Sequence, residues 1–163
     1  MSNLERINGK IYLLEDLKIQ LKNWRANGDV IVFTNGCFDI LHQGHIEVLA
    51  KTADLGNRLI IGLNSDSSVK LLKGESRPIN NQKARALLLA AIDFVDAVVV
   101  FSQQTPKQLI AEIHPNILAK GGDYSISDIA GHDIVQKDGG KVITIPLTEG
   151  FSSTNIIDKL QDG

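Results

Sequence analysis

The chain has little of what several large classes of protein require. It has one cysteine in 163 residues, which excludes an intramolecular disulfide framework and fits a reducing compartment. Its 17 Lys and Arg residues against 19 Asp and Glu residues leave a formal charge of −2, which argues against a nucleic-acid-binding protein. The longest clean apolar run is the seven residues Ala86–Ile92, whereas a membrane span needs roughly 20.

Targeting signals and common cofactor motifs are also missing. The first residues, Met1–Arg6, contain no apolar stretch of the kind a secretory signal has, so we expect a cytoplasmic protein without membrane contact. The sequence has no GxGxxG, no GxxxxGK[ST] and no GxSxG. A dinucleotide oxidoreductase, a P-loop protein and an α/β-hydrolase are therefore not indicated.

The hydrophobic pattern predicts one α/β domain over residues 1–163, with a helical N-terminal lead-in over residues 1–28. Five short apolar segments barely alternate, as strands buried on both faces of a parallel sheet do. Helical patterns separate them, which favours a Rossmann-like open parallel sheet with helices on both faces. The expected strands are Val30–Thr34, Arg58–Asn64, Ala97–Phe101, Asn116–Ala119 and Val142–Pro146.

The loops that follow these strands are the expected site, because ligands of open α/β sheets bind outside the carboxyl ends of the strands. Four loops follow from this rule: Asn35–His45, Ser65–Pro78, Lys120–Tyr124 and Thr148–Thr154.

The first loop holds two histidines on either side of Gly44. His42 and His45 share one face if they lie on a first helical turn. They could be satisfied core histidines, or zinc ligands with Cys37 and Asp39, although no standard zinc spacing is present. A phosphate site fits best, because both imidazoles can donate hydrogen bonds and Gly44 lets a triphosphate approach the helix N-terminus.

The other loops carry groups suited to a polyphosphate. Lys73 and Arg77 could close over it on a mobile loop, or could simply be solvated. The glycine pair in Lys120–Tyr124 suggests close approach of a ligand to the backbone. The run Ser152–Thr154 has more hydroxyls than one helix cap needs, so the surplus could bind phosphate oxygens.

The segment Thr34–His45, with the strand before it, resembles the signature of HxGH nucleotidyltransferases. Within that superfamily the chain is most similar to stand-alone D-glycero-β-D-manno-heptose 1-phosphate adenylyltransferases, a domain that many bacteria fuse to a sugar kinase. The similarity runs from about Val30 to Leu160, and Phe151 and Ser153 depart slightly from the family pattern. The blocks that carry it are Thr34–His45, Asn64–Asp66 with Leu72–Pro78, Lys120–Tyr124 with Ile129–Gly131, and Gly139–Gly140 with Ser152–Ile157.

The resemblance implies a five-stranded parallel sheet in the order 3-2-1-4-5 and a reaction that needs ATP and Mg²⁺. AMP would pass to the sugar 1-phosphate, giving ADP-heptose for lipopolysaccharide and pyrophosphate. The Mg²⁺ would be carried by the triphosphate, without direct protein ligands.

The resemblance also implies roles for individual residues. His42, His45 and Lys73 would be catalytic, with the imidazoles on the α- and β-phosphate oxygens and Lys73 over the reacting phosphates. Asp39 is expected to orient its loop rather than act as a base. The expected nucleotide-binding residues are Asn35, Gly36, Cys37, Phe38, Asp39, Gly44, Lys120, Gly122, Asp123, Thr148, Ser152, Ser153 and Thr154. The expected substrate-binding residues are Asn64, Asp66, Arg77 and Arg85.

Other functions stay open from the sequence. A related enzyme could use CTP with an alcohol phosphate such as glycerol 3-phosphate, or ATP with FMN, and no physical feature derives adenine over cytosine. A non-catalytic nucleotide-binding protein and a structural zinc protein are further alternatives. The expected partners are a nucleotide and a sugar phosphate, and a homodimer is expected only because small α/β enzymes often form one.

Overall fold

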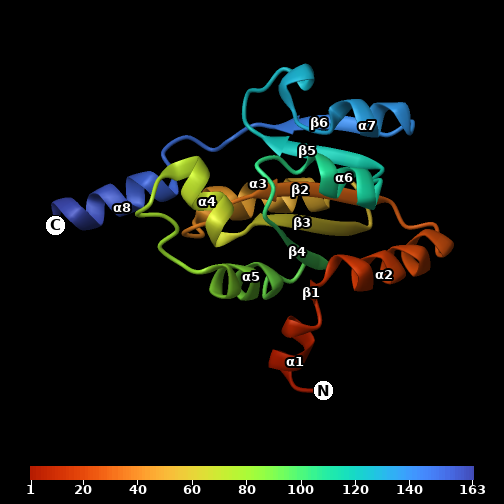
Figure 1. Cartoon of the computed structure of the whole chain (residues 1–163), viewed down its shortest axis with the longest axis horizontal. Coiled ribbons are helices and arrows are strands. Elements are labelled where there is room, and N and C mark those ends of the chain that lie inside the picture. The colour runs from red at the N-terminus through yellow and green to blue at the C-terminus, as the bar shows by residue number, and fades with distance from the viewer.

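A computed structural model describes all 163 residues, and its centre is a sheet of six parallel strands. The strands are β1 (Ile11–Tyr12), β2 (Ile31–Gly36), β3 (Arg58–Asn64), β4 (Ala97–Phe101), β5 (Ile117–Gly121) and β6 (Lys141–Ile145). They lie in the order β1-β4-β3-β2-β5-β6 (Figure 1).

Helices connect the strands and cover both faces of the sheet. They are α1 (Asn3–Asn8), α2 (Leu14–Ala26), α3 (Gln43–Ala53), α4 (Asp66–Lys73), α5 (Gln82–Ala90), α6 (Lys107–Ile113), α7 (His132–Lys137) and α8 (Ser153–Asp162), with a 3₁₀ turn η1 (Ile126–Asp128). None of them is long and apolar enough to span a membrane.

The predicted Rossmann-like class is confirmed, with one strand more than expected. The five predicted strands correspond to β2 through β6, and their order β4-β3-β2-β5-β6 is the predicted 3-2-1-4-5. The expectation of five strands is wrong because β1 adds an edge strand, in which Ile11 pairs with Val98 of β4. This strand lies between α1 and α2, in the stretch expected to be a helical lead-in, and two residues are too few to show a strand pattern.

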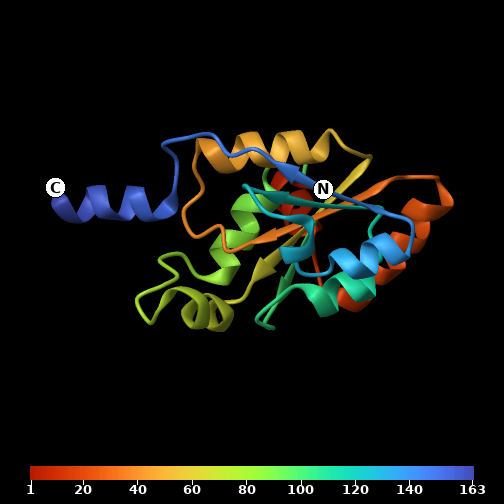
Figure 2. The same cartoon turned by 90° about the horizontal axis from the view of Figure 1, so that it is seen from above.

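Two apolar layers lie on the two faces of the sheet because side chains alternate along each strand. Ile31 and Phe33 pack with Leu17 and Trp24 of α2, in the layer that also includes α6 and α7. Val32 points to the opposite layer, which includes α3 and α5. Figure 2 shows α3 on one side of the sheet and α2, α6 and α7 on the other. The strands are therefore buried on both faces, which explains why they barely alternate in sequence.

The carboxyl ends of the central strands meet at one edge. Asn35 and Gly36 of β2 stand opposite Gly62 and Leu63 of β3, so the loops after both strands begin at the same level. Helix α8 leaves this edge and extends away from the sheet (Figures 1 and 2).

Candidate active site

A cavity of about 640 Å³ opens at the carboxyl ends of the strands, which is within the usual size range of small-molecule sites. Its walls come from the loops after β2, β3, β4, β5 and β6. Fifteen of the twenty site residues expected from the sequence line it, namely Asn35, Gly36, Cys37, Phe38, Asp39, His42, Gly44, His45, Asn64, Lys73, Lys120, Thr148, Ser152, Ser153 and Thr154.

The two predicted histidines stack against each other at the start of α3. Their ring centroids are 3.7 Å apart, with 23° between the ring planes. The backbone N–H of His42 donates to Nδ1 of His45 at 3.4 Å. This hydrogen bond requires an unprotonated Nδ1, so the neutral His45 ring carries its proton on Nε2.

Both imidazoles are poor proton acceptors in this environment. Burial lowers the pKa of His42. Burial, together with the nearby charges of His42 and Lys73, lowers the pKa of His45 to about 4. At neutral pH both rings are therefore uncharged, and each offers one N–H donor. The buried Nδ1 of His42 has no hydrogen-bond partner in the protein.

The buried carboxylate of Asp39 connects the histidine loop to the loop after α4. Its carboxylate accepts from Nε of Arg77 at 2.6 Å and from the backbone N–H groups of Ile79 and Asn80 at 2.8 and 3.0 Å. Burial alone would raise the pKa of Asp39, but these hydrogen bonds lower it on balance. Every recorded contact of the fully buried carboxylate is to the protein, which is compatible with the expected role of Asp39 in orienting its loop.

Three of the expected substrate-binding residues do not line the cavity. Arg77 is turned toward Asp39. The Arg85 guanidinium is fully buried, and it donates to Asp66 and to backbone carbonyls. The protein itself pairs Arg77 with Asp39 and Arg85 with Asp66, although Nη2 of Arg77 is buried without a hydrogen-bond partner. The expected contact of Arg77, Arg85 and Asp66 with a substrate therefore stays a prediction.

The hydroxyls before α8 do different tasks. Ser152 caps the helix, since its Oγ accepts from the N–H of Asn155 at 2.9 Å. Ser153 is buried, and its Oγ donates to the Ile40 carbonyl at 2.8 Å. Thr154 is exposed. The protein thus uses two of the three hydroxyls that the sequence offered for phosphate, and Ser153 ties α8 to the histidine loop.

Two lysines supply positive charge to the cavity. Lys73 ends α4 and lies close enough to His45 to lower the pKa of that ring. Lys120, near the end of β5, has its Nζ 5.5 Å from the centre of the Tyr124 ring. Burial lowers the pKa of Lys120, and a bound anion would favour the charged form of this amine.

Gly44 and Gly122, which were expected to let a ligand approach the backbone, are packed closely against neighbouring side chains. A Cβ on Gly44 would lie 2.9 Å from Cβ of Phe151 and 3.1 Å from the His42 ring, so a side chain at this position would crowd both residues. Gly122 has a φ of +118°, and a Cβ there would lie 2.9 Å from the Tyr124 ring. Neither Gly122 nor Asp123 lines the cavity, and the expected ligand contacts of these two residues stay a prediction.

Sequence reasoning missed part of the wall. Gln104, Thr105 and Pro106 line the cavity from the loop after β4, although that loop was not among the four expected. The rule that selected the other loops applies equally to this strand and would have found it. Phe151, noted only as a departure from the family pattern, also lines the cavity, with its ring centre 6.2 Å from that of His42.

The cavity suits an anion better than a protein-bound metal. No group of three or more His, Cys, Asp or Glu side chains is placed to hold a metal ion, and Asp39 is committed to Arg77. The neighbouring groups are imidazole, ammonium and hydroxyl, which can contact phosphate oxygens.

Comparison with known proteins decides the family. The Cytidylyltransferase-like family model matches residues 33–159, which include the last four residues of β2, the strands β3 to β6 and the whole histidine loop. The chain belongs to the cytidylyltransferase-like family. The predicted membership in the nucleotidyltransferase superfamily is thereby confirmed.

The chain is similar over most of its length to curated proteins with a common name. The chain is 49% identical over 148 residues to "Bifunctional protein HldE" of Rhodopseudomonas palustris strain HaA2, covering 91% of this chain and 30% of that protein. It is 52% identical over 144 residues to the protein of that name from Nitrobacter winogradskyi, covering 88% and 30%. The chain thus spans about a third of the length of these relatives.

A solved structure confirms the fold. The crystal structure of the lipopolysaccharide core biosynthesis protein from Thermoplasma volcanium superposes with a TM-score of 0.61 and 25% sequence identity. The match covers 74% of this chain and 98% of that one.

Proposed function

We propose that the chain is a single nucleotidyltransferase domain that transfers AMP from ATP to D-glycero-β-D-manno-heptose 1-phosphate, releasing pyrophosphate and forming ADP-heptose. The observation that carries the reaction type is the pair of uncharged imidazoles facing a cavity that Lys73 and Lys120 also line. The sugar substrate rests on the sequence resemblance and on the similarity to the HldE proteins.

The reaction needs no nucleophile from the protein. A phosphate oxygen of the sugar attacks the α-phosphorus of ATP, and the bond to the oxygen that bridges to the β-phosphorus breaks as pyrophosphate leaves. Cys37 lines the cavity, but burial raises the pKa of its thiol, so the reactive thiolate is disfavoured. The contribution of the protein is position and charge stabilisation, and alignment of two substrates can supply roughly 7–11 kcal/mol.

The histidines stabilise charge that develops at the α- and β-phosphates. An uncharged ring with its proton on Nε2, as His45 has, can donate one hydrogen bond to a phosphate oxygen. Lys73 adds a positive charge at the end of α4, and the exposed Thr154 hydroxyl is available to the leaving group. Asn64 also lines the cavity and is proposed to contact the sugar phosphate.

Magnesium fits this site as an ion that the triphosphate carries. Mg²⁺ prefers oxygen ligands and commonly binds through substrate phosphates, and the cavity residues are suited to hold the phosphates. When bound, the ion neutralises charge on the triphosphate. The proposal includes a cytoplasmic location, in keeping with one half-buried cysteine.

The proposal also includes a homodimer, because small α/β enzymes often form symmetric dimers and several of the exposed large apolar side chains lie on one segment. Leu71, Leu72 and Ile79, on α4 and the loop after it, are 73%, 54% and 56% exposed. Sedimentation that gives the mass of one chain at micromolar concentration would remove this part of the proposal.

The test is a panel of ATP, CTP, GTP and UTP against heptose 1-phosphate, glycerol 3-phosphate and FMN, scored by pyrophosphate release. We expect release with ATP and heptose 1-phosphate, and a loss of roughly 10²–10³ in kcat for His45→Ala, as for removal of a preorganised donor. The matched control is His114→Asn, an exposed histidine that ends α6 in a left-handed conformation that asparagine tolerates.

Other outcomes of the substrate panel would change the proposal in specific ways. Turnover of CTP with glycerol 3-phosphate would replace the substrates but keep the reaction type. Nucleotide binding without pyrophosphate release from any pair would favour a non-catalytic nucleotide-binding protein. A His45→Ala enzyme within a few-fold of wild type would refute the assigned role of the histidines.

A further inference from the structure

We propose that Arg85 is a positioning residue for the transfer reaction. It holds the peptide between Cys37 and Phe38 so that the Phe38 N–H faces the cavity and donates to the nucleotide phosphates. This inference rests on the proposed function, because it takes a nucleoside triphosphate as the ligand of that cavity.

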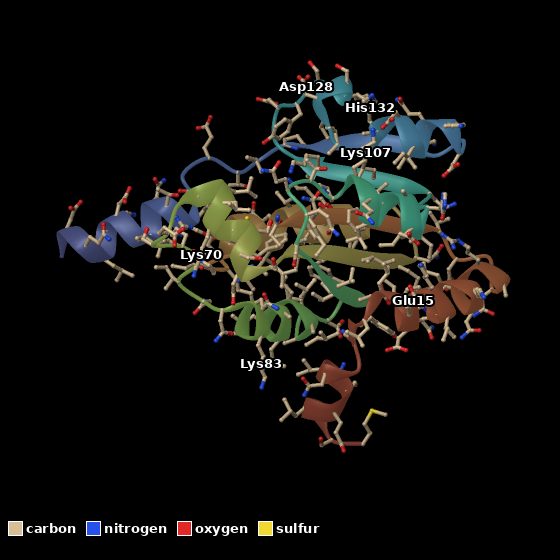
Figure 3. The ribbon with its side chains drawn as sticks, viewed as in Figure 1. Glu15, Lys70, Lys83, Lys107, Asp128 and His132 are labelled. Atoms are coloured by element: carbon tan, nitrogen blue, oxygen red, sulfur yellow. The ribbon has the colours of Figure 1, made fainter.

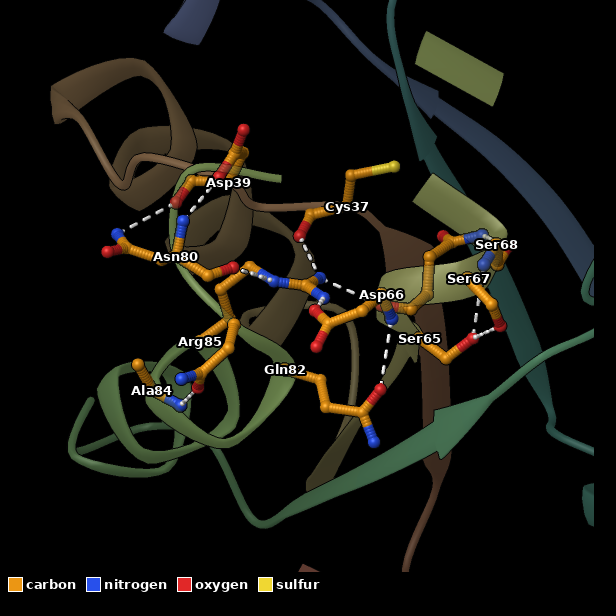
Figure 4. Close-up of polar contacts among 12 residues, drawn as sticks. Cys37, Asp39, Ser65, Asp66, Ser67, Ser68, Asn80, Gln82, Ala84 and Arg85 are labelled. Carbon is orange, nitrogen blue, oxygen red and sulfur yellow. Dashed lines mark hydrogen bonds and ion pairs between the residues drawn. The ribbon is translucent and has the colours of Figure 1, made fainter. Parts of the chain in front are cut away.

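Arg85 is the largest fully buried side chain of the protein, with 1% of the residue exposed. Its Nε donates to the Asn80 carbonyl at 2.9 Å, and its Nη1 donates to the carbonyls of Cys37 and Asn64, each at 2.8 Å. Its Nη2 donates to the Asp66 carboxylate at 2.8 Å. Figure 4 shows the guanidinium at the centre of these contacts.

The acceptors come from four places that the sequence separates widely. Cys37 follows β2, Asn64 ends β3, Asp66 begins α4, and Asn80 lies shortly before α5. One planar group therefore fixes the end of one strand relative to the next strand and to the helix that carries Lys73. A guanidinium can do this because its five N–H donors have a fixed fork geometry.

The contact with Cys37 determines which way the next N–H points. A trans peptide is planar, so its N–H lies opposite its C=O. Since the Cys37 carbonyl points to Arg85, the Phe38 N–H points away from Arg85. Cys37 and Phe38 line the cavity while Arg85 does not, and from this we infer that the N–H is directed to the cavity side.

The Phe38 N–H is free for such a contact. No protein group accepts a hydrogen bond from it. Phe38 also has a φ of +46°, a left-handed conformation that a bulky side chain disfavours and that the surroundings must impose. Asp39 anchors the loop on the far side of Phe38, so Arg85 and Asp39 hold this residue from both sides.

The test is Arg85→Lys, which keeps the charge but cannot present the planar fork. The readouts are kcat at saturating substrates, the melting temperature, and the amide ¹H–¹⁵N resonance of Phe38 during titration with α,β-methylene-ATP and Mg²⁺. We expect at least a tenfold loss of kcat and a much reduced shift of the Phe38 resonance. The control is Arg58→Lys, since Arg58 bridges Asp29 and Asp96 at the start of β3, and its kcat should stay within twofold of wild type.

A positioning role is refuted if Arg85→Lys keeps kcat within twofold and the Phe38 resonance shifts as in wild type. The positioning role is also refuted if Arg85→Lys and Arg58→Lys lower the melting temperature by similar amounts and lose the same fraction of kcat. If Arg85→Lys does not fold, the titration of the wild-type protein is the test. The inference is contradicted if the analogue shifts the His45 resonance and leaves the Phe38 resonance unchanged. Failure of the proposed function looks different: wild type then binds the analogue through Phe38 but releases no pyrophosphate from any substrate pair.

Discussion

Asp39→Asn removes a negative charge from the centre of the site without changing the size of the side chain. The carboxylate of Asp39 is fully buried, and the Arg77 side chain that donates to it is 12% exposed. The substituted amide can still accept from Ile79 or Asn80. In one orientation the amide NH₂ faces the Arg77 guanidinium, and in the other it faces the backbone N–H donors. In both cases a donor faces a donor, so one polar group loses its partner.

The size of the effect follows from this burial. Breaking a buried ion pair by removing one partner costs about 3–5 kcal/mol, because a buried charge is left uncompensated. Arg77 keeps some contact with water, so we expect the lower end, about 3 kcal/mol. For a domain of this size, about 1 kcal/mol shifts the melting temperature by roughly 2–4 °C, which gives a decrease of about 6–12 °C.

Urea unfolding followed by circular dichroism measures this difference, and Asp29→Asn is the matched control. Asp29 pairs with Arg58, but the two side chains are 17% and 35% exposed, and such solvated pairs contribute about 1 kcal/mol or less. The reasoning is wrong if Asp39→Asn costs less than about 1 kcal/mol, or no more than Asp29→Asn.

Two further predictions concern charge in the cavity. Folding lowers the pKa of His45 from 6.5 to about 4. Between pH 6.5 and pH 4 the unfolded chain therefore binds a proton at this residue that the folded chain does not. The free energy of unfolding should decrease as the pH falls through this range. The loss of unfolding free energy should be on the order of 2 kcal/mol after allowance for the partial exposure of the ring. Denaturant titrations at several pH values should show a smaller decrease of this free energy for His45→Gln than for wild type. Parallel pH dependences of the two proteins would contradict the assignment. Lys73→Ala should lower kcat for pyrophosphate release by about 10–10²-fold. Lys70→Ala should leave kcat unchanged, because Lys70 lies one turn earlier on α4 (Figure 3) and does not line the cavity. Equal effects of the two substitutions would remove Lys73 from the reaction.

Local patterns predicted most of the sheet and most of the cavity wall. Strands such as β3 are continuous apolar runs because both faces are covered, and the rule that ligands bind at strand carboxyl ends needs only the position of each strand. The edge strand β1 was missed because its two residues pair with β4 through contacts that the local sequence does not encode.

Two of the expected site residues make contacts within the protein that local sequence patterns could not predict. Arg85 is a cation in a helix of otherwise ordinary composition, and only the fold brings it to carbonyls 48 and 21 residues away. Ser153 reads as a free hydroxyl until the fold places it against Ile40, 113 residues earlier. A polar side chain that binds a ligand and one that satisfies a distant backbone group look the same in sequence.

The most direct test of the central claim is a crystal structure of the protein with α,β-methylene-ATP and Mg²⁺. The account predicts oxygens of the α- and β-phosphates within hydrogen-bond distance, about 3 Å, of the ring nitrogens of His42 and His45. A triphosphate that lies elsewhere in the cavity, with both imidazoles out of reach, would contradict it.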